Sequence, residues 1–399
     1  MLVQFMCKNI LSFKEEAILD MSAVAAYKEH CDNLIDLGVG EKYLKVLSIY
    51  GANASGKSNL IIAFMRFQDI IEESFDSVSE DKAPAIKRYY QPFEFTKEKE
   101  NIEFEIIFIM NQYEYQYGFE YNDMEIVNEW LYRKSRDTKR VSTIYERNKE
   151  KIRFGPIARK EGEKYGVLIP KDALILSGFS KFNIKTTIFK DVYDEITSVL
   201  ATDSSGFETT KFLEGALPKI IDKKEKKKEL LEFLGAIDTD IVDITYDKDG
   251  EDIEFNTFHV DEEGNKYSIP LRHESQGTIK GINIYISAIS AIWLNRTMII
   301  DELNARLHPL LLKFIVNLFY TKTSSAQLIY TTHDMTLMRK EFFRRDQICF
   351  VQKNKFGKSE LNALSDYKAR NDSSFEKDYL AGVYGGIPIL KDFRVGEDD

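Results

Sequence analysis

An eight-residue stretch near the N-terminus has the residue types of a phosphate-binding loop. It follows an apolar run at 46–50, precedes an apolar-rich helix and reads Gly51-Ala52-Asn53-Ala54-Ser55-Gly56-Lys57-Ser58. The glycines allow successive backbone N–H groups to point at a phosphate, while Lys57 brings a charge to the β- and γ-phosphates. The Ser58 hydroxyl is a ligand for Mg²⁺. The sequence therefore predicts a nucleotide site at Gly51, Asn53, Ala54, Ser55, Gly56, Lys57, Ser58 and Asn59.

Two carboxylates and a histidine follow predicted strands later in the chain. Asp301 and Glu302 end an apolar strand at 297–300, and open α/β sheets bind ligands at the carboxyl ends of their strands. We expect Asp301 to hold Mg²⁺, directly or through water, and Glu302 to polarise the attacking water. A pair of acids after a strand is otherwise a common helix start. His333 directly follows the next predicted strand, and its imidazole can donate to a γ-phosphate.

A second anion site is predicted at the start of a later apolar helix. Ser275, Gly277 and Thr278 lie just before the helix that continues from Lys280, and the N-terminus of a helix attracts anions. Because the chain already cradles its own nucleotide with the phosphate loop, a second γ-phosphate site suggests the nucleotide of a partner subunit. The alternative is an ordinary capped helix.

Composition narrows the class of protein. The chain has 399 residues and a formal net charge of −10, so no overall positive field points to nucleic acid, although a local basic face stays open. Three widely separated cysteines favour free thiols over a zinc site. No apolar run approaches the roughly 20 residues that span a bilayer, and the N-terminus is expected to be a strand rather than a signal peptide. We expect a soluble cytoplasmic protein with no membrane partner.

Strand patterns surround the phosphate loop. An edge strand is expected within 2–13, and period-two alternation predicts an antiparallel meander between 102 and 154. A half-buried sheet face is favoured over a base-stacking platform for its aromatic stripe, which comprises Tyr113, Tyr115, Tyr117, Phe119 and Tyr121.

The remaining elements are expected to alternate between helices and strands. A buried strand is predicted at 173–176, helices at 185–235, three antiparallel strands at 241–271 and a hairpin at 348–364. The lysine-rich run 222–228 is expected to be a solvated helix face, with nucleic-acid contact as the alternative.

These clusters together resemble the ATP-binding-cassette ATPases, in particular their SMC, RecF and OLD-like heads. Ser275-Gln276-Gly277-Thr278 is similar to a degenerate signature motif, 303–309 resembles the D-loop, Thr332-His333-Asp334 the switch histidine, and 9–13 the start of RecF-like heads. The resemblance implies an α/β P-loop NTPase head, with a mixed central sheet, that uses ATP and Mg²⁺. The implied roles are catalysis by Lys57, Glu302 and His333, metal binding by Ser58 and Asp301, and contact with a partner's nucleotide by Ser275, Gly277 and Thr278.

Three further stretches, at 92–95, 115–120 and 379–388, are similar to the stand-alone bacterial ATPases of the RloA/AbiL type, which are phage-defence proteins. This resemblance implies a homodimer or higher homo-oligomer and a partner effector, often a TOPRIM-like nuclease encoded nearby. Two positions depart from the family pattern. Leu11 replaces a basic residue, and no glutamine follows 173–176 to form a Q-loop, whereas Gln91 precedes the meander, which is the wrong place in chain order.

The predicted architecture has three parts. Residues 1–155 form a first ATPase lobe with the phosphate loop and the antiparallel β lobe, 156–240 a mostly helical insertion, and 241–399 a second lobe with the signature, the acids and His333. The predicted function is an ATPase that closes head-to-tail around ATP and controls an effector in antiphage defence. The main alternative is a RecF-like repair ATPase that binds DNA directly. A transporter cassette and a non-hydrolysing scaffold fit the residues less well.

Overall fold

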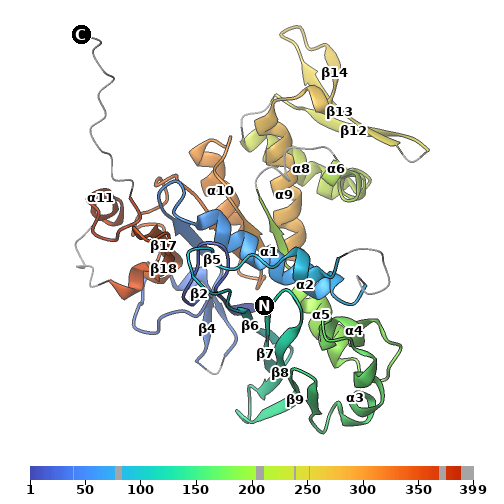
Figure 1. Cartoon of the computed structure of the whole chain (residues 1–399). Coiled ribbons are helices and arrows are strands. Elements are labelled where there is room, and N and C mark those ends of the chain that lie inside the picture. Colours follow the sequence, from blue (N-terminus) through green and yellow to red (C-terminus); the bar gives the residue numbers. More distant parts are fainter. Residues whose placement is uncertain are drawn as a thin grey trace, which may run out of the picture.

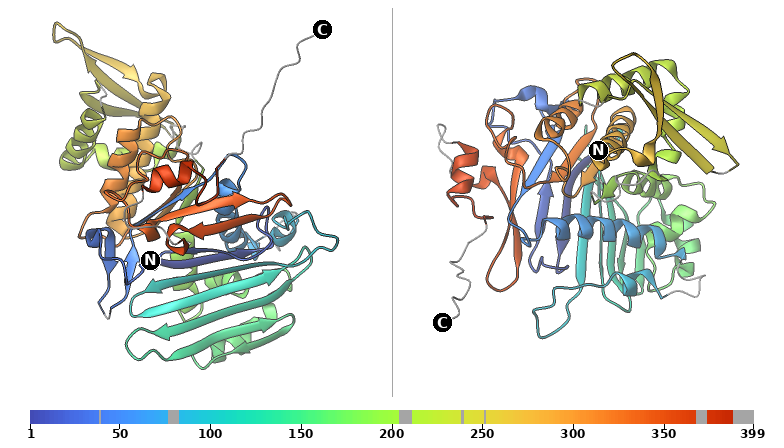
Figure 2. Two further views of the ribbon diagram at one scale, coloured as in Figure 1. Left: turned by 90° about the vertical axis from the view of Figure 1, so that its left-hand side faces the viewer. Right: turned by 90° about the horizontal axis from the view of Figure 1, so that it is seen from above.

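The computed structural model describes residues 1–38, 40–76, 83–203, 211–237, 240–250, 252–367 and 374–387. Within these residues, two large sheets contact one long helix, α1 (Lys57–Glu73), and a smaller sheet extends away from them (Figures 1 and 2). Pro388, the last residue of the stretch 379–388, lies outside the described residues.

The first large sheet has seven antiparallel strands in the order β10-β9-β8-β7-β6-β1-β2. The predicted meander is confirmed. The expectation that the N-terminal strand is an edge was wrong, because β1 pairs with β6 on one side and β2 on the other, which buries Phe5 and Cys7 completely. The strands are β1 (Leu2–Lys8), β2 (Ala17–Asp20), β6 (Ile102–Met110), β7 (Tyr113–Tyr121), β8 (Ile126–Ser135), β9 (Val141–Asn148) and β10 (Lys151–Phe154).

The second large sheet has six strands in the order β11-β15-β16-β5-β17-β18. All neighbours in it are parallel except β17 and β18, so the carboxyl ends of five strands meet at one edge. The strands are β5 (Val46–Tyr50), β11 (Leu200–Thr202), β15 (Thr297–Ile300), β16 (Gln327–Thr331), β17 (Ile348–Lys353) and β18 (Ser359–Ala363).

Helix α1 joins the two sheets because its apolar face packs on both. Phe67 stacks on Phe119 of β7 at 5.6 Å between ring centroids, and the same core cluster includes Ile49 of β5 and Ile329 of β16. A second core cluster covers the other face of the parallel sheet with α9 (Gln276–Leu294), α10 (Pro309–Phe319) and α11 (Phe375–Leu380). The phosphate loop and the acids therefore lie at the carboxyl edge of a sheet that has a core cluster on each face.

The segment predicted as a strand at 173–176 is instead the start of a helix, α4 (Ile175–Lys181). The buried carboxylate of Glu129 decides this, because it accepts hydrogen bonds from the backbone N–H groups of Ile175 (2.8 Å) and Leu176 (3.1 Å). The apolar run is equally compatible with a strand, and only this long-range cap distinguishes the two.

The predicted helical segment 156–240 packs in two places. Its first helices, α3 (Arg159–Tyr165), α4 and α5 (Ile188–Thr197), join the core around α1. Strand β11, which the sequence did not predict, then pairs with β15. The later helices join a third core cluster with α9, and they are α6 (Lys211–Glu214), α7 (Leu217–Ile221) and α8 (Lys224–Ala236).

The smaller sheet confirms the three antiparallel strands predicted at 241–271. It consists of β12 (Asp243–Asp249), β13 (Asp252–Val260) and β14 (Lys266–Pro270) and lies with α6 and α8 away from the seven-stranded sheet (Figure 1). Two lysines of the run 222–228 contact side chains of neighbouring elements. Lys227 binds Asp243 at 2.6 Å, and Lys226 lies 3.5 Å above the Trp293 ring.

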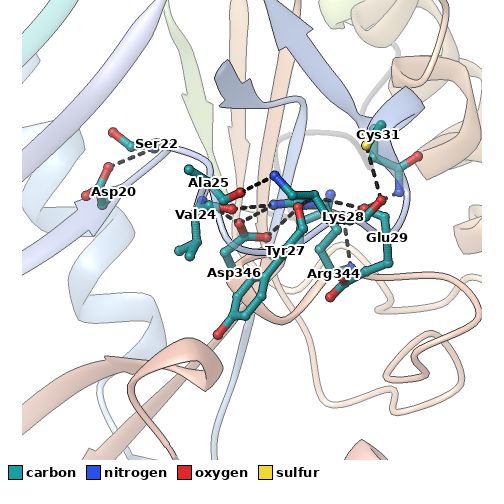
Figure 3. Close-up of polar contacts among 12 residues, drawn as sticks. Asp20, Ser22, Val24, Ala25, Tyr27, Lys28, Glu29, Cys31, Arg344 and Asp346 are labelled. Carbon is teal, nitrogen blue, oxygen red and sulfur yellow. Dashed lines mark hydrogen bonds and ion pairs between the residues drawn. The ribbon is translucent and has the colours of Figure 1, made fainter. Parts of the chain in front are cut away.

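A buried ion pair fixes the loop that follows β2. Arg344 is completely buried, and its guanidinium donates to both carboxylate oxygens of Asp346 and to backbone carbonyls of Val24, Tyr27 and Glu29 (Figure 3). This loop leads to a small hairpin, β3 (Leu34–Asp36) and β4 (Lys42–Leu44). The remaining short helices are α2 (Ala85–Arg88), η1 (Cys31–Asn33), η3 (Gly166–Leu168), η5 (Leu271–His273), η6 (Arg345–Gln347) and η7 (Leu364–Asp366).

One described helix, α9, is long and apolar enough by length and composition to cross a membrane. Its 19 residues exceed the apolar run expected from the sequence. More than half of it is buried inside the protein, and the buried residues include Lys280 and Asn283. This burial is what a core helix shows.

Candidate functional site

The phosphate loop joins β5 to α1 through a backbone that only glycine accommodates at two positions. Gly56 precedes α1 with φ 111°, and a Cβ there would come within 2.4 Å of the Ser359 hydroxyl. A Cβ at Gly51 would come within 2.4 Å of the Val351 carbonyl oxygen. The loop is therefore pressed against β17 and β18, the neighbouring strands on one side of β5.

Lys57 is buried at the start of α1 with its ammonium turned onto the loop. Its Nζ donates to the carbonyls of Gly51 (2.8 Å) and Ala52 (3.1 Å). Burial lowers the pKa of Lys57 below its usual range, and the carboxylates of Asp301 and Glu302 act in the opposite direction. The two hydrogen bonds hold the Lys57 ammonium inside the loop.

The two acids follow β15 as expected, and a threonine holds them. The Thr331 hydroxyl, at the end of β16, donates to Asp301 Oδ1 (2.5 Å) and accepts from the Glu302 backbone N–H (2.7 Å). Glu302 has a left-handed backbone, with φ 50°. Asp301 is nearly buried, whereas Glu302 is exposed, so the two carboxylates meet different surroundings.

His333 lies beside the second acid. Its Nε2 is 3.9 Å from Glu302 Oε1. Burial and the charge of Lys57 lower the pKa of His333 below its usual value, so its imidazole is neutral at pH 7. Asn304 Oδ1 accepts from the Thr332 hydroxyl (2.9 Å) and links the predicted D-loop to the residue before the histidine.

A cavity of about 430 Å³ brings most of these predicted residues together. Lys57, Ser58, Glu302 and His333 all line it, along with Asn53, Ala54, Ser55, Gly56, Asn59 and Lys353. The Ser58 hydroxyl and the Asp301 carboxylate are hard oxygen donors of the kind that suit Mg²⁺. The described residues contain no group of three or more His, Cys, Asp and Glu that could hold a metal by themselves.

The residues of the predicted signature lie elsewhere. The Ser275 hydroxyl caps α9 by accepting from the Thr278 N–H (3.1 Å), and a Cβ at Gly277 would lie 3.3 Å from the Arg306 carbonyl oxygen. None of Ser275, Gly277 and Thr278 lines the cavity at the phosphate loop. Within one subunit, they form a capped helix that packs on the predicted D-loop.

Sequence reasoning missed several residues at the site. The sequence predicts Asn304 only as part of the D-loop stretch and assigns no role to Thr331. The signal for both residues is their place at the carboxyl edge of the sheet. Gln91 was set aside because it precedes the meander, but its carbonyl accepts from the Leu11 N–H (2.9 Å) and it lines a cavity next to Asn59. Gln91 thus lies near Asn59 although it precedes the meander in chain order. Lys353, at the end of β17, also went unnoticed.

Comparisons with known proteins give a family match that spans these residues. A family model described as "AAA domain, putative AbiEii toxin, Type IV TA system" matches residues 46–339, which contain the phosphate loop, both acids and His333. A search of curated proteins gives no match.

Two solved structures are similar in fold. "SMC head domain from Thermotoga maritima" has a TM-score of 0.44 and 13% identity, covering 91% of this chain and 98% of that chain. "Crystal structure of the SmcHead bound to the C-winged helix domain of ScpA" has a TM-score of 0.42 and 13% identity, covering 95% and 99%.

The predicted fold class is confirmed, since a phosphate loop at the centre of a mixed sheet with an antiparallel β lobe is the head of an ABC-type P-loop NTPase. The family model covers well over half of the sequence, and the chain therefore belongs to this AAA domain family, AAA_21.

Proposed function

We propose that this protein binds Mg·ATP at the phosphate loop and hydrolyses it slowly. The observation that carries this proposal is the single cavity lined by Lys57, Ser58, Glu302 and His333, which come from three separate parts of the chain. A loop alone would indicate only phosphate binding. A carboxylate and a neutral imidazole in the same cavity add the groups that hydrolysis needs.

Each side chain has a role that follows from its position. Lys57 exchanges its loop carbonyls for the β- and γ-phosphate oxygens, and Glu302 orients and polarises the attacking water. His333 donates to the γ-phosphate, and Thr331 keeps the two acids in place. Bound at Ser58 and Asp301, Mg²⁺ would neutralise charge on the phosphates.

Two copies of the chain close head-to-tail around ATP in this proposal. Ser275, Gly277 and Thr278 lie outside the cavity of their own subunit, so a nucleotide that they contact belongs to the other copy. ATP then stabilises the dimer by mass action, and hydrolysis reopens it. We also propose that the chain is organised in three parts, 1–155, 156–240 and 241–399. The last part carries the signature residues.

The closed dimer is the signalling state. The family description names a toxin of a toxin–antitoxin system, which supports a role in bacterial defence against phage. We propose that the dimer controls an effector in the cytoplasm, such as a TOPRIM-like nuclease encoded nearby, and that nucleic acid is reached through that partner or through a local basic face.

Sedimentation velocity with Mg·ATP tests the dimer. Wild type is compared with Lys57→Ala, Ser275→Arg and Glu302→Gln, which remove phosphate binding, the partner contact and hydrolysis. We expect ATP to drive association most strongly in Glu302→Gln, because the bridging nucleotide persists, and not in the other two variants.

A separate measurement of phosphate release checks the enzyme itself. Unchanged turnover in Glu302→Gln would show that Glu302 does not polarise the attacking water. Association that ignores both nucleotide and Ser275 would leave a P-loop ATPase without the proposed dimer.

A further inference from the structure

The two ends of the cavity at the phosphate loop can be told apart by the other cavities that adjoin it. A cavity of about 990 Å³ shares Asn53, Ala54, Ser55, Lys353 and His333 with it, and because His333 is among them it adjoins the γ-phosphate end. A third cavity, of about 340 Å³, shares Asn59 and Lys353, and neither Glu302 nor His333 lines it. Since the base of a nucleotide lies at the end away from the γ-phosphate, this third cavity, hereafter the base pocket, lies where the base and ribose must go.

The wall of the base pocket contains an exposed aromatic ring. Phe95 is 75% exposed, yet its position is restrained on two sides. The buried ring of Phe93 meets it edge-on at 5.5 Å and 87°. A Cβ at Gly357, where φ is +80°, would come within 2.5 Å of the Phe95 ring. A large apolar ring held in place but left open to solvent is a ready stacking surface.

Hydrogen bonds tie the base pocket to the phosphate loop. Asn59 Nδ2 donates to the Ser12 hydroxyl (2.7 Å), which also contacts the Ser359 hydroxyl (2.8 Å). Ser359 in turn donates to the Ser55 carbonyl (2.6 Å). The Leu11 N–H donates to the Gln91 carbonyl (2.9 Å), so the segment that carries Phe95 is held to the same framework. The distance from the phosphates to the ring is thus set by the fold.

We propose that the purine base of the nucleotide stacks on Phe95 in the base pocket, with Lys353 contacting the phosphate or ribose where the two cavities join. This deepens the proposed function and rests on it. Aromatic rings stack on bases whatever their hydrogen-bond pattern, whereas the side-chain amide of Gln91 carries both a donor and an acceptor for a base edge. The segment 91–95 then gives the ATPase its preference for a nucleotide over a bare polyphosphate.

Competition titrations with two ligands test the proposal. The affinities of the full-length protein for ATP and for inorganic tripolyphosphate are compared in wild type, Phe95→Ala and Phe356→Ala. Phe356 is the matched control, since it is 65% exposed on the same turn as Gly357 but does not line the base pocket. We expect Phe95→Ala to weaken ATP binding about tenfold and to leave tripolyphosphate unchanged. Phe356→Ala should change neither, and Phe95→Tyr should retain ATP affinity.

The outcomes separate this inference from the proposed function. Wild type that binds neither ligand overturns both. ATP binding that is unchanged in Phe95→Ala overturns the base pocket alone, and so does an equal loss for ATP and tripolyphosphate, which would mean a disturbed phosphate loop. Lys353→Ala is expected to weaken both ligands, because its charge lies at the junction of the cavities.

Discussion

Thr331 lies 2.5 Å from Asp301 and donates its hydroxyl hydrogen to that carboxylate, while the same oxygen accepts the backbone N–H of Glu302. The last residue of one strand therefore orients both acids at the end of its neighbour. Such a contact is invisible in the sequence, where the two positions are 30 residues apart.

Replacing Thr331 by valine should slow ATP hydrolysis about 10- to 100-fold, as expected for the loss of a residue that orients a metal ligand. Valine keeps the shape of the side chain but neither donates to Asp301 nor accepts from Glu302. Turnover is measured as phosphate release at saturating ATP. Thr331→Ser retains the hydroxyl and should remain close to wild type, and equal activity in the valine variant would contradict the role.

The protonation of His333 should change when nucleotide binds. Burial and Lys57 hold the pKa of His333 low, so in the free protein the ring takes up a proton only at a pH below its usual range and is neutral at pH 7. A bound polyphosphate adds negative charge and raises the pKa, so binding takes up a proton as the pH falls from 7 toward 6.

NMR titration of the five histidines, with and without a non-hydrolysable ATP analogue, measures this shift. His333→Gln identifies the resonance and serves as the control. A His333 resonance whose midpoint does not move on adding the analogue would place the γ-phosphate away from this ring.

Glu274 should control association rather than nucleotide binding. It directly precedes Ser275, and its carboxylate accepts from the buried Thr257 hydroxyl and contacts His259 Nε2 at 2.7 Å, which ties the start of α9 to β13. Glu274→Ala frees this start, so ATP-driven dimerisation should weaken at least several-fold while a single subunit binds ATP unchanged.

Sedimentation at increasing protein concentration measures the first effect of Glu274→Ala, and fluorescent-nucleotide titration at low concentration the second. Glu262→Ala changes an exposed glutamate on the neighbouring β13–β14 turn and should alter neither. Loss of nucleotide binding in Glu274→Ala would show a general defect instead of a local one.

Arg344→Met should destabilise the protein by about 3–5 kcal/mol, the usual cost of leaving one member of a buried ion pair alone. Methionine removes the guanidinium donor from the Asp346 carboxylate, which keeps the Val24 N–H (2.7 Å), and from the carbonyls of Val24, Tyr27 and Glu29 (Figure 3). Urea unfolding measures the loss. The double variant Arg344→Met with Asp346→Leu should lose less free energy of unfolding than Arg344→Met alone. A larger loss would show that the bonds to the carbonyls contribute more than the ion pair.

Short-range patterns allowed much of the fold to be predicted. The alternation in β6 and β7 and the turns at Gly250 and Gly264 are properties of adjacent residues, so the meander and the small sheet were found with nearly the right limits. The prediction of a strand at 173–176 was wrong for the opposite reason. The Glu129 carboxylate that caps the helix there comes from a strand more than forty residues away.

The sequence by itself determined which residue types the candidate site contains, because a phosphate loop, an acid pair after a strand and a histidine after the next strand are each local arrangements of residues. Only the tertiary structure decided what surrounds them. Thr331 reaches Asp301 because β15 and β16 are parallel neighbours, and Gln91 and Phe95 lie beside Asn59 because the first sheet packs against α1. Such contacts depend on which strands pair and on which elements pack together. Both are selected by the burial of apolar surface over the whole chain.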